Sequence, residues 1–302
     1  MNKMNCLLGI DGGGTKTEFL VTDSSGREIR RLILGPSNPV STGIETTFSV
    51  LEEGIIKICE DYDASQIYAF AGIAGAKNGD NQKHINEFLS RFGFASYDCG
   101  SDIDLLLETA LKGENGTAVI MGTGIVAYAC SGEKLFRTGG RGYMIDKGGS
   151  GFNFGSDALN SAFEFTDGRG GSETILDIIE SKLGKKLEDC VAEIYNGGPS
   201  YVASFAPAVF EAYNLGDATA KEIIERNAYE AAKIISGAKK NTSDKVVVCG
   251  GLCRQKEILY PLLLKYIEGD VSLTFLDEPM VNGAILLAKR LSENAEIRNE
   301  KS

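Results

Sequence analysis

The segment GIDGGGTKT at residues 9–17 decides the fold. It joins two apolar stretches, CLLGID from Cys6 and TEFLVTD from Thr17, and both are typical of β-strands. Three consecutive glycines exceed what most two-residue hairpin turns need. A turn of Gly and Thr also exposes backbone N–H groups that can converge on an anion. The segment therefore predicts a β-hairpin whose turn binds phosphate.

The first third of the chain continues as a mixed α/β pattern. EIRRLILG from Glu28 adds a third strand, so residues 5–35 form a meander. The periodicity then predicts, in order, a helix at about 42–62, the strand IYAFAGIAG, a helix at about 80–92, a short strand near YDCGS and a helix at about 103–112. Hairpin strands followed by alternating strands and helices indicate a mixed sheet with helices around it.

Near residue 117 the same pattern begins again. TAVIMGTGIVAYAC is an apolar strand, a Gly-Thr-Gly turn at 122–124 and a second apolar strand. We expect the strand LFRTGG, a glycine-rich loop to about residue 155, several helices at about 156–240, the strand VVVCGG, a helix, the strand VSLTFL and a last helix from about 280. Two lobes that open on the same hairpin predict an internal duplication.

Two familiar nucleotide motifs fit this chain poorly. The P-loop needs Gly-Lys-Ser/Thr, but Thr15 separates Gly14 from Lys16 and a strand follows instead of a helix. The residues Gly122, Gly124 and Ala127 match G-x-G-x-x-A, yet the following IVAYAC alternates like a strand where a dinucleotide fold requires a helix. Neither a P-loop nor a dinucleotide site is predicted.

Composition narrows the function further. With 302 residues the chain can fill two lobes, and its net charge of -11 without a basic run disfavours nucleic acid and anionic membranes as partners. We find neither a signal-peptide core nor about 18 continuous apolar residues, so a cytoplasmic protein is expected. The seven cysteines are scattered and form no CxxC motif, so we expect reduced thiols and no disulfide framework. The single histidine, His84, lies in a polar helical stretch and excludes multi-histidine chemistry.

Four motifs together resemble one known family. They are GIDGGGTKT at 9–17, GTG at 122–124, CGGLC at 249–253 and PMVNGAILLA at 279–288. They are similar to the two phosphate segments, the adenosine segment and the closing helix of the N-acetylglucosamine kinase branch of the BadF/BadG/BcrA/BcrD-type ATPases, in the actin/Hsp70/sugar-kinase superfamily. The likeness spans nearly the whole chain.

This resemblance implies an α/β, two-lobed, actin/Hsp70/hexokinase-like (ribonuclease H-like) fold with an interlobe cleft. It implies an N-terminal lobe of residues 1–112, completed by a C-terminal helix at 280–302 that packs back on it, and a C-terminal lobe of residues 113–279. The activity implied is ATP-dependent phosphorylation of a small sugar. N-acetylglucosamine is the first candidate substrate, and glucosamine and N-acetylmuramic acid are the alternatives. ATP and Mg²⁺ are the cofactors, and a homodimer is left open.

The resemblance also assigns the nucleotide side of the site. Asp11 would hold Mg²⁺, through water. Gly250 and Gly251 would let adenosine approach the backbone. The residues that would bind ATP phosphates are Gly12, Gly13, Gly14, Thr15, Lys16, Gly122, Thr123 and Gly124.

On the sugar side, Asn38 in GPSNP matches an asparagine that binds the sugar, and Gly75 in AGIAG matches the loop under the substrate. Asp102 in GSD falls where these kinases place the aspartate that accepts the proton of the sugar hydroxyl. The alternative for Asp102 is a helix N-cap. Asp104 is its nearest competitor as base.

One segment departs from the family. Many relatives carry GDEGSG after the second hairpin, whereas this chain reads GYMIDKGGSGF from Gly142. Asp146 is the candidate for the usual sugar-binding aspartate, although Lys147 occupies that column in an ungapped alignment. Recognition of the sugar substituent at C2 or C3 therefore stays open.

Two other functions were weighed. An ATPase activator of a reductase or dehydratase, of the 2-hydroxyacyl-CoA dehydratase or benzoyl-CoA reductase type, typically has a cysteine before its GTG segment, but here Met121 precedes Gly122. A sugar-sensing repressor would need a helix-turn-helix, and none precedes the strand at residue 5.

Overall fold

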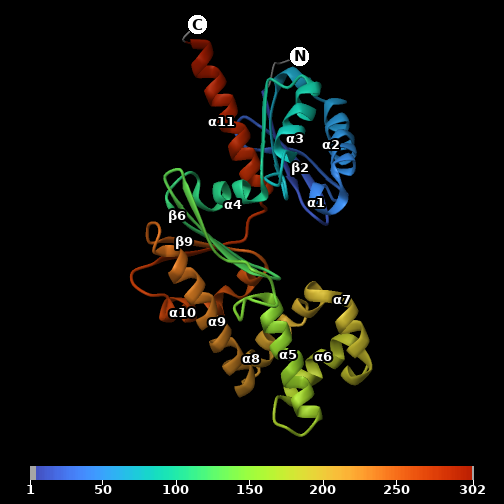
Figure 1. Ribbon diagram of the computed structural model, residues 1–302, viewed down its shortest axis with the longest axis vertical. Coiled ribbons are helices and arrows are strands. Elements are labelled where there is room, and N and C mark those ends of the chain that lie inside the picture. Colours follow the sequence, from blue (N-terminus) through green and yellow to red (C-terminus); the bar gives the residue numbers. More distant parts are fainter. Residues whose placement is uncertain (1–4, 301–302) are drawn as a thin grey trace. The chain divides into compact units, whose positions relative to one another are not determined.

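The computed structural model describes residues 5–300, with the side chains of residues 5–298 (Figure 1). The ends of the predicted N-terminal lobe and closing helix, positions 1–4 and 301–302, lie outside the described residues. The chain divides into two compact units. Unit 1 comprises the residues up to Gly113 and those from Glu278 onward, and unit 2 comprises Glu114–Asp277.

Unit 1 is built on a five-stranded mixed sheet in the order β3-β2-β1-β4-β5. Its strands are β1 (Cys6–Gly12), β2 (Thr17–Asp23), β3 (Glu28–Leu34), β4 (Ile67–Ile73) and β5 (Ser96–Gly100). The first three form the antiparallel meander, and β4 and β5 continue the sheet parallel to β1. The predicted meander and mixed sheet are confirmed.

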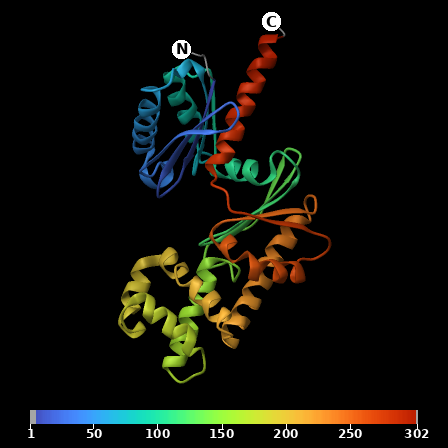
Figure 2. The ribbon, with the colours of Figure 1, turned by 180° about the vertical axis from the view of Figure 1, so that it is seen from behind.

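Helices cover both faces of this sheet (Figure 2). They are α1 (Pro39–Thr42), α2 (Ile44–Cys59), α3 (Asn81–Leu89), α4 (Asp102–Leu111) and α11 (Val281–Glu300), with short 3-10 turns η1 (Ala64–Gln66) and η2 (Ser90–Phe92). Because successive strand residues face opposite sides, Leu8 packs in the core with α2 and α3, whereas Leu7 packs with α4 and α11. A Cβ at Gly9 would lie 3.0 Å from the Val281 carbonyl, so glycine allows α11 to approach the sheet.

Unit 2 repeats this topology with a sheet in the order β10-β9-β6-β7-β8. Its strands are β6 (Gly116–Met121), β7 (Ile125–Ser131), β8 (Lys134–Gly139), β9 (Lys245–Cys249) and β10 (Ser272–Leu276). Strands β6 to β8 form an antiparallel meander, β9 runs parallel to β6, and β10 runs parallel to β9. The arrangement of strands is the same as in unit 1, which supports the predicted duplication.

The helices of unit 2 enclose the larger hydrophobic core of the two. They are α5 (Gly151–Thr166), α6 (Glu173–Leu183), α7 (Val191–Ala203), α8 (Ala206–Asn214), α9 (Ala218–Lys239) and α10 (Lys256–Tyr266), with 3-10 turns η3 (Leu187–Cys190) and η4 (Gly251–Gln255). No helix among residues 5–300 is long and apolar enough to cross a bilayer.

One predicted boundary is wrong. The glycine-rich loop was expected to reach about residue 155, but α5 begins at Gly151. Ser150 caps this helix, since its hydroxyl accepts the Asn153 N–H and the Asn153 side chain accepts the Ser150 N–H. Such a reciprocal cap satisfies two N–H groups that would otherwise lack partners, and it outweighs the low helix propensity of the two glycines at 151 and 155.

Candidate active site

The glycine turn of unit 1 is closed by one backbone hydrogen bond. The Gly13 N–H donates to the Lys16 carbonyl at 2.9 Å. Gly12 is buried, and a Cβ there would overlap the Ser37 hydroxyl and the Ile73 side chain. Gly14 and Thr15, in contrast, are exposed. The turn therefore has a packed base and an exposed tip where a phosphate can approach the backbone.

Two distant segments are hydrogen-bonded to this turn. The Ser37 N–H donates to the Gly13 carbonyl at 3.0 Å, and the Ala74 N–H donates to the Gly12 carbonyl at 2.7 Å. The Thr17 hydroxyl also donates to the Ser37 hydroxyl at 2.7 Å. The structure thereby brings GPSNP and AGIAG, the two segments predicted for the sugar, against the predicted phosphate turn.

Asn38 and Gly75 meet within this arrangement. Asn38 caps α1, since its Oδ1 accepts the Val40 N–H at 2.9 Å. Gly75 has φ +81°, and a Cβ there would lie 2.6 Å from that same Oδ1. Among residues 5–300 the Asn38 Nδ2 donates no hydrogen bond. The half-buried asparagine is thus held by its oxygen, and its amide nitrogen is available to a ligand.

Carboxylates gather beside the turn. Asp11, near the end of β1, is the register partner of Glu18 on β2. The pKa of Asp11 is raised to about 6, first by burial and then by the negative charges of Glu18 and Asp102. An opposing effect comes from the positive charge of Lys16.

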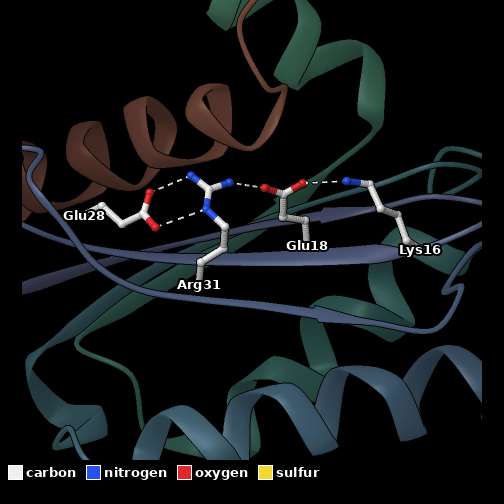
Figure 3. A network of polar contacts seen from close by, with 4 residues as sticks. All are labelled: Lys16, Glu18, Glu28 and Arg31. Atoms are coloured by element: carbon white, nitrogen blue, oxygen red, sulfur yellow. Dashed lines mark hydrogen bonds and ion pairs between the residues drawn. The ribbon is translucent and has the colours of Figure 1, made fainter.

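Glu18 organises an ion-pair chain on this face of the sheet (Figure 3). The side chain of Glu18 is only 9% exposed, and its two oxygens bind the Lys16 ammonium at 2.9 Å and the Arg31 guanidinium. Arg31 in turn pairs with Glu28 at 2.7 Å. The ammonium of Lys16, a predicted phosphate ligand, is therefore already bound to a carboxylate.

Asp102 is the first residue of α4, and it is not the cap of that helix. Ser101 is the N-cap, and Asp104 accepts the Ser101 N–H at 2.7 Å and its hydroxyl at 2.9 Å. Asp104 also pairs with Lys77 at 2.8 Å. The N-cap alternative for Asp102 is therefore wrong, because Ser101 and Asp104 fill that role.

The Asp102 carboxylate sits in a partly desolvated setting although the residue as a whole is exposed. Displacement of water by surrounding protein raises its pKa, and the Ile103 and Asp102 N–H groups at the helix start oppose that change. The negative charge of Asp104 raises the pKa further. Asp102 is thus close enough to Asp11 to affect its ionisation, yet it has no structural partner side chain among residues 5–300.

The carboxylates around Asp11 suit a magnesium ion that is bound largely through water and substrate. Carboxylate oxygens are the ligands that Mg²⁺ prefers, and Mg²⁺ usually combines one or two of them with water and substrate phosphates. Asp11 supplies a half-buried carboxylate next to two further negative charges. Among the residues described, no group of three or more His, Cys, Asp or Glu side chains forms a complete metal cage. The site fits an ion held largely by water and ligand.

The Gly-Thr-Gly turn of unit 2 rests on a helix start. The Gly122 N–H donates to the Gly124 carbonyl at 2.9 Å. The Gly151 and Phe152 N–H groups of α5 donate to the Gly122 and Thr123 carbonyls at 2.7 and 3.0 Å. The turn is thereby fixed entirely by backbone hydrogen bonds, and it contains no charged residue.

A pocket of about 460 Å³ opens beside this turn. Gly250, with φ +105°, lies so close to β6 that a Cβ would be 2.7 Å from the Met121 carbonyl. Besides Gly122, Thr123, Gly151 and Gly251, the pocket is lined by small or apolar residues, namely Ser200, Ala203, Ser204, Ala206, Pro207 and Leu252. Its size and lining suit a nucleoside. The 200–207 stretch was missed from the sequence, where it reads only as a helical segment.

Asp146 lies in a second, smaller pocket on the same turn. This pocket of about 250 Å³ also includes Thr123, Arg137 and Ser150. The Asp146 carboxylate accepts the Arg141 N–H at 2.6 Å and the Gly142 N–H at 3.1 Å. Lys147 is exposed. Asp146 therefore holds the loop in shape, and one of its oxygens is already engaged.

The chain is similar to known proteins over most of its length. The family described as BadF/BadG/BcrA/BcrD ATPase matches residues 8–285. The chain is 28% identical to an N-acetylmuramic acid/N-acetylglucosamine kinase from Clostridium acetobutylicum, over 95% of this chain and 99% of that one. It is 28% identical to an N-acetyl-D-glucosamine kinase from Dictyostelium discoideum, over 93% and 97%.

A solved structure shares the fold. It is a ROK family glucokinase from Streptomyces griseus in complex with glucose and AMPPNP, with a TM-score of 0.57, 16% identity, and coverage of 95% of this chain and 99% of that one. The predicted α/β fold of the actin-like sugar kinases is thereby confirmed.

Proposed function

Because the chain belongs to the BadF/BadG/BcrA/BcrD ATPase family, we propose that it is an ATP-dependent kinase of an amino sugar, with N-acetylglucosamine as the first candidate. Its full-length likeness to two kinases named for N-acetylglucosamine supports this substrate class. The name of the Clostridium acetobutylicum enzyme adds N-acetylmuramic acid as a candidate acceptor.

The observation that carries the proposal is that the Asp102 carboxylate has no partner side chain among the described residues. Phosphoryl transfer needs a group that accepts the proton of the attacking hydroxyl, and this group must be ionised and unoccupied. Asp104 caps the helix and pairs with Lys77, so it is occupied twice. Asp102 neither caps the helix nor pairs with a lysine, and its charge affects the pKa of Asp11. We assign Asp102 as the general base.

The remaining residues have supporting roles in this proposal. Asn38 and Gly75 orient the sugar, with Asn38 donating from Nδ2. Asp146 contributes through its loop. The two glycine turns, with Thr15, Lys16 and Thr123, bind phosphates, and Gly250 with Gly251 admits the nucleoside. Asp11 holds the magnesium ion, which when bound would neutralise phosphate charge.

The direct test is a panel of acceptors with ATP and Mg²⁺. N-acetylglucosamine, glucosamine, N-acetylmuramic acid and glucose would each be supplied at millimolar concentration. ADP release would be followed by a coupled assay, and the phosphorylated sugar by mass spectrometry. We expect sugar-dependent ADP release and a phosphate ester, with N-acetylglucosamine giving the highest kcat/KM. ATP hydrolysis that does not depend on any sugar would contradict the proposal and fit the activator branch of the family.

A further inference from the structure

The two glycine turns differ in the cations available to them. Nucleotide phosphates carry several negative charges, and proteins usually neutralise part of that charge with Lys or Arg. Beside the unit 1 turn, Lys16 is held by the buried Glu18 (Figure 3). The unit 2 turn, Gly122–Gly124, contains no charged residue. A cation for this turn must come from elsewhere in unit 2.

The position of Arg137 in the sheet directs its guanidinium toward the turn. Arg137 lies on β8 opposite Tyr128 of β7, and Gly139 lies opposite Val126. The Arg137 Nη2 donates to the Gly140 carbonyl, just past the end of β8. The guanidinium therefore extends along β8 to the end of the sheet where β7 begins. The Gly122–Gly124 turn immediately precedes β7.

Arg137 and the turn share one pocket. The pocket of about 250 Å³ is lined by Arg137, by the turn residues Thr123 and Gly124, and by Ser150 at the cap of α5. It lies on the sheet face opposite the main core, because Ala127 points into that core while Val126 lines the pocket. Thr123 also lines the larger, nucleoside-sized pocket. The turn thus separates the two pockets, and a ligand can contact both.

The charge of Arg137 is not neutralised by the protein. Among the side chains of residues 5–298 no carboxylate lies within ion-pair distance of Arg137, and its guanidinium donates to the Gly140 carbonyl. The carboxylate in the same pocket, Asp146, is engaged by the backbone N–H groups of Arg141 and Gly142. The Arg137 guanidinium is therefore available to an anionic ligand.

We propose that Arg137 binds the terminal phosphate oxygens of the nucleotide, acting as the cation of the unit 2 turn. This inference rests on the proposed function. Arginine presents several N–H donors in a planar fork that matches two phosphate oxygens at once. One donor bound to Gly140 orients the guanidinium and leaves others for the ligand. The nucleoside occupies the larger pocket, the Thr123 and Gly124 N–H groups contact the phosphate chain, and Arg137 contacts its end.

Three variants of the full chain test this role. Arg137→Met removes the charge and keeps much of the aliphatic stem, and Arg137→Lys restores the charge without the fork. Lys134→Met, on the same strand and also exposed, is the control with the same change in net charge. Binding of ADP, ATP and adenosine would be measured by calorimetry without sugar, and KM for ATP and for sugar by the coupled assay.

We expect Arg137→Met to weaken ATP binding roughly 10-fold to 100-fold, as typical for a lost charge-assisted contact, and to raise KM for ATP similarly. Adenosine binding and KM for N-acetylglucosamine should stay within about twofold, Arg137→Lys should recover part of the loss, and Lys134→Met should resemble the wild type.

Unchanged ATP binding in Arg137→Met overturns the inference while leaving the proposed function intact. Equal losses for adenosine and ATP would show a structural role and also overturn it. A selective loss for acidic sugars, with ATP unaffected, would assign Arg137 to the acceptor instead. If the wild type binds no nucleotide, the proposed function and this inference both fail.

Discussion

The glycine turns of units 1 and 2 occupy the same place in two sheets of the same topology, but only one is surrounded by acids. Each unit also contains a Ser-capped helix, but the two helices follow different strands: α4 follows β5 in unit 1, and α5 follows β8 in unit 2. The two units therefore share a strand order, whereas the carboxylates that affect Asp11 lie in unit 1.

The contrast also appears in how each turn is held. In unit 1 the Asp11, Glu18 and Asp102 carboxylates lie beside the turn, and the pKa of Asp11 is raised by burial and then by the charges of Glu18 and Asp102. In unit 2 the turn is fixed by backbone hydrogen bonds from Gly151 and Phe152. We interpret unit 1 as the side that carries out proton transfer and metal binding, and unit 2 as the side that holds the nucleotide.

The largest effect is expected at Asp102. Asp102→Asn keeps the size of the side chain but cannot accept a proton, so kcat on the best sugar should fall roughly 100-fold to 10,000-fold. ATP binding should change little. The control is Asp104→Asn, which retains an oxygen acceptor for Ser101 and should lose far less kcat. If Asp102→Asn kept more than about half of the wild-type kcat, unit 1 would not supply the base.

The next effect concerns two glycines that leave no room for a side chain, Gly12 at the unit 1 turn and Gly250 directly after β9. Gly12→Ala would overlap Ser37, and Gly250→Ala would combine a positive φ with a contact on β6. We expect each to lose about 1–3 kcal/mol of stability, measured by urea unfolding. The matched controls are Gly14→Ala and Gly251→Ala, where a Cβ has no neighbour closer than 4.0 Å. If a control lost as much as its partner, the packed-base description of that turn would be wrong.

Asp11 should give unit 1 a pH dependence of stability. Its pKa is about 6 in the fold against an ordinary 3.8, so between these values the folded state holds a proton that the unfolded state has released. This contribution to stability therefore declines as the pH rises from about 4 to about 6. In chelator-treated buffer, Asp11→Asn should gain stability relative to the wild type across that window, by at most about 3 kcal/mol.

A second variant checks the cause of that dependence. Glu18→Gln removes a negative charge that raises the pKa of Asp11, so the pH range over which stability declines should become narrower. Chemical unfolding between pH 3.5 and 7, read by circular dichroism, measures both variants. A stability difference between Asp11→Asn and the wild type that does not vary with pH would contradict the assignment.

The smallest effect is expected at Lys16. Its side chain is 55% exposed and pairs with Glu18, and exposed ion pairs contribute at most about 1 kcal/mol. Lys16→Met should therefore leave the melting temperature nearly unchanged and raise KM for ATP only a few-fold. A loss larger than that of Arg137→Met would reverse the comparison, because it would mean that Lys16 leaves Glu18 to bind phosphate.

The sequence alone determined most of the secondary structure, the two meanders and their repetition, but not the strand order of either sheet. Apolar alternation and glycine turns are local signals, so the strands from Cys6 to Leu34, the second hairpin and the closing helix were all predicted. The resemblance to one family also assigns Asp11, Asn38, Gly75 and Asp102 to the site, and that assignment stays a prediction. The one wrong boundary, at Gly151, came from glycines that suggested a loop where a capping box starts a helix.

Only the tertiary structure decided which contacts each of those residues makes. The spacing of Ser101 and Asp104 is that of a capping box, but only the fold shows that Asp104 also pairs with Lys77 and that Asp102 has no partner side chain among the described residues. Nor does the sequence show that Glu18 holds Lys16, that Arg137 reaches past Gly140, or that residues 200–207 line a pocket with Gly251. The Lys77–Asp104 ion pair and the pocket wall join segments far apart in the chain. The Lys16–Glu18 and Arg137–Gly140 contacts are short-range, but they depend on the direction that each side chain takes in the folded sheet. Strands and turns, in contrast, follow from the pattern of neighbouring residues.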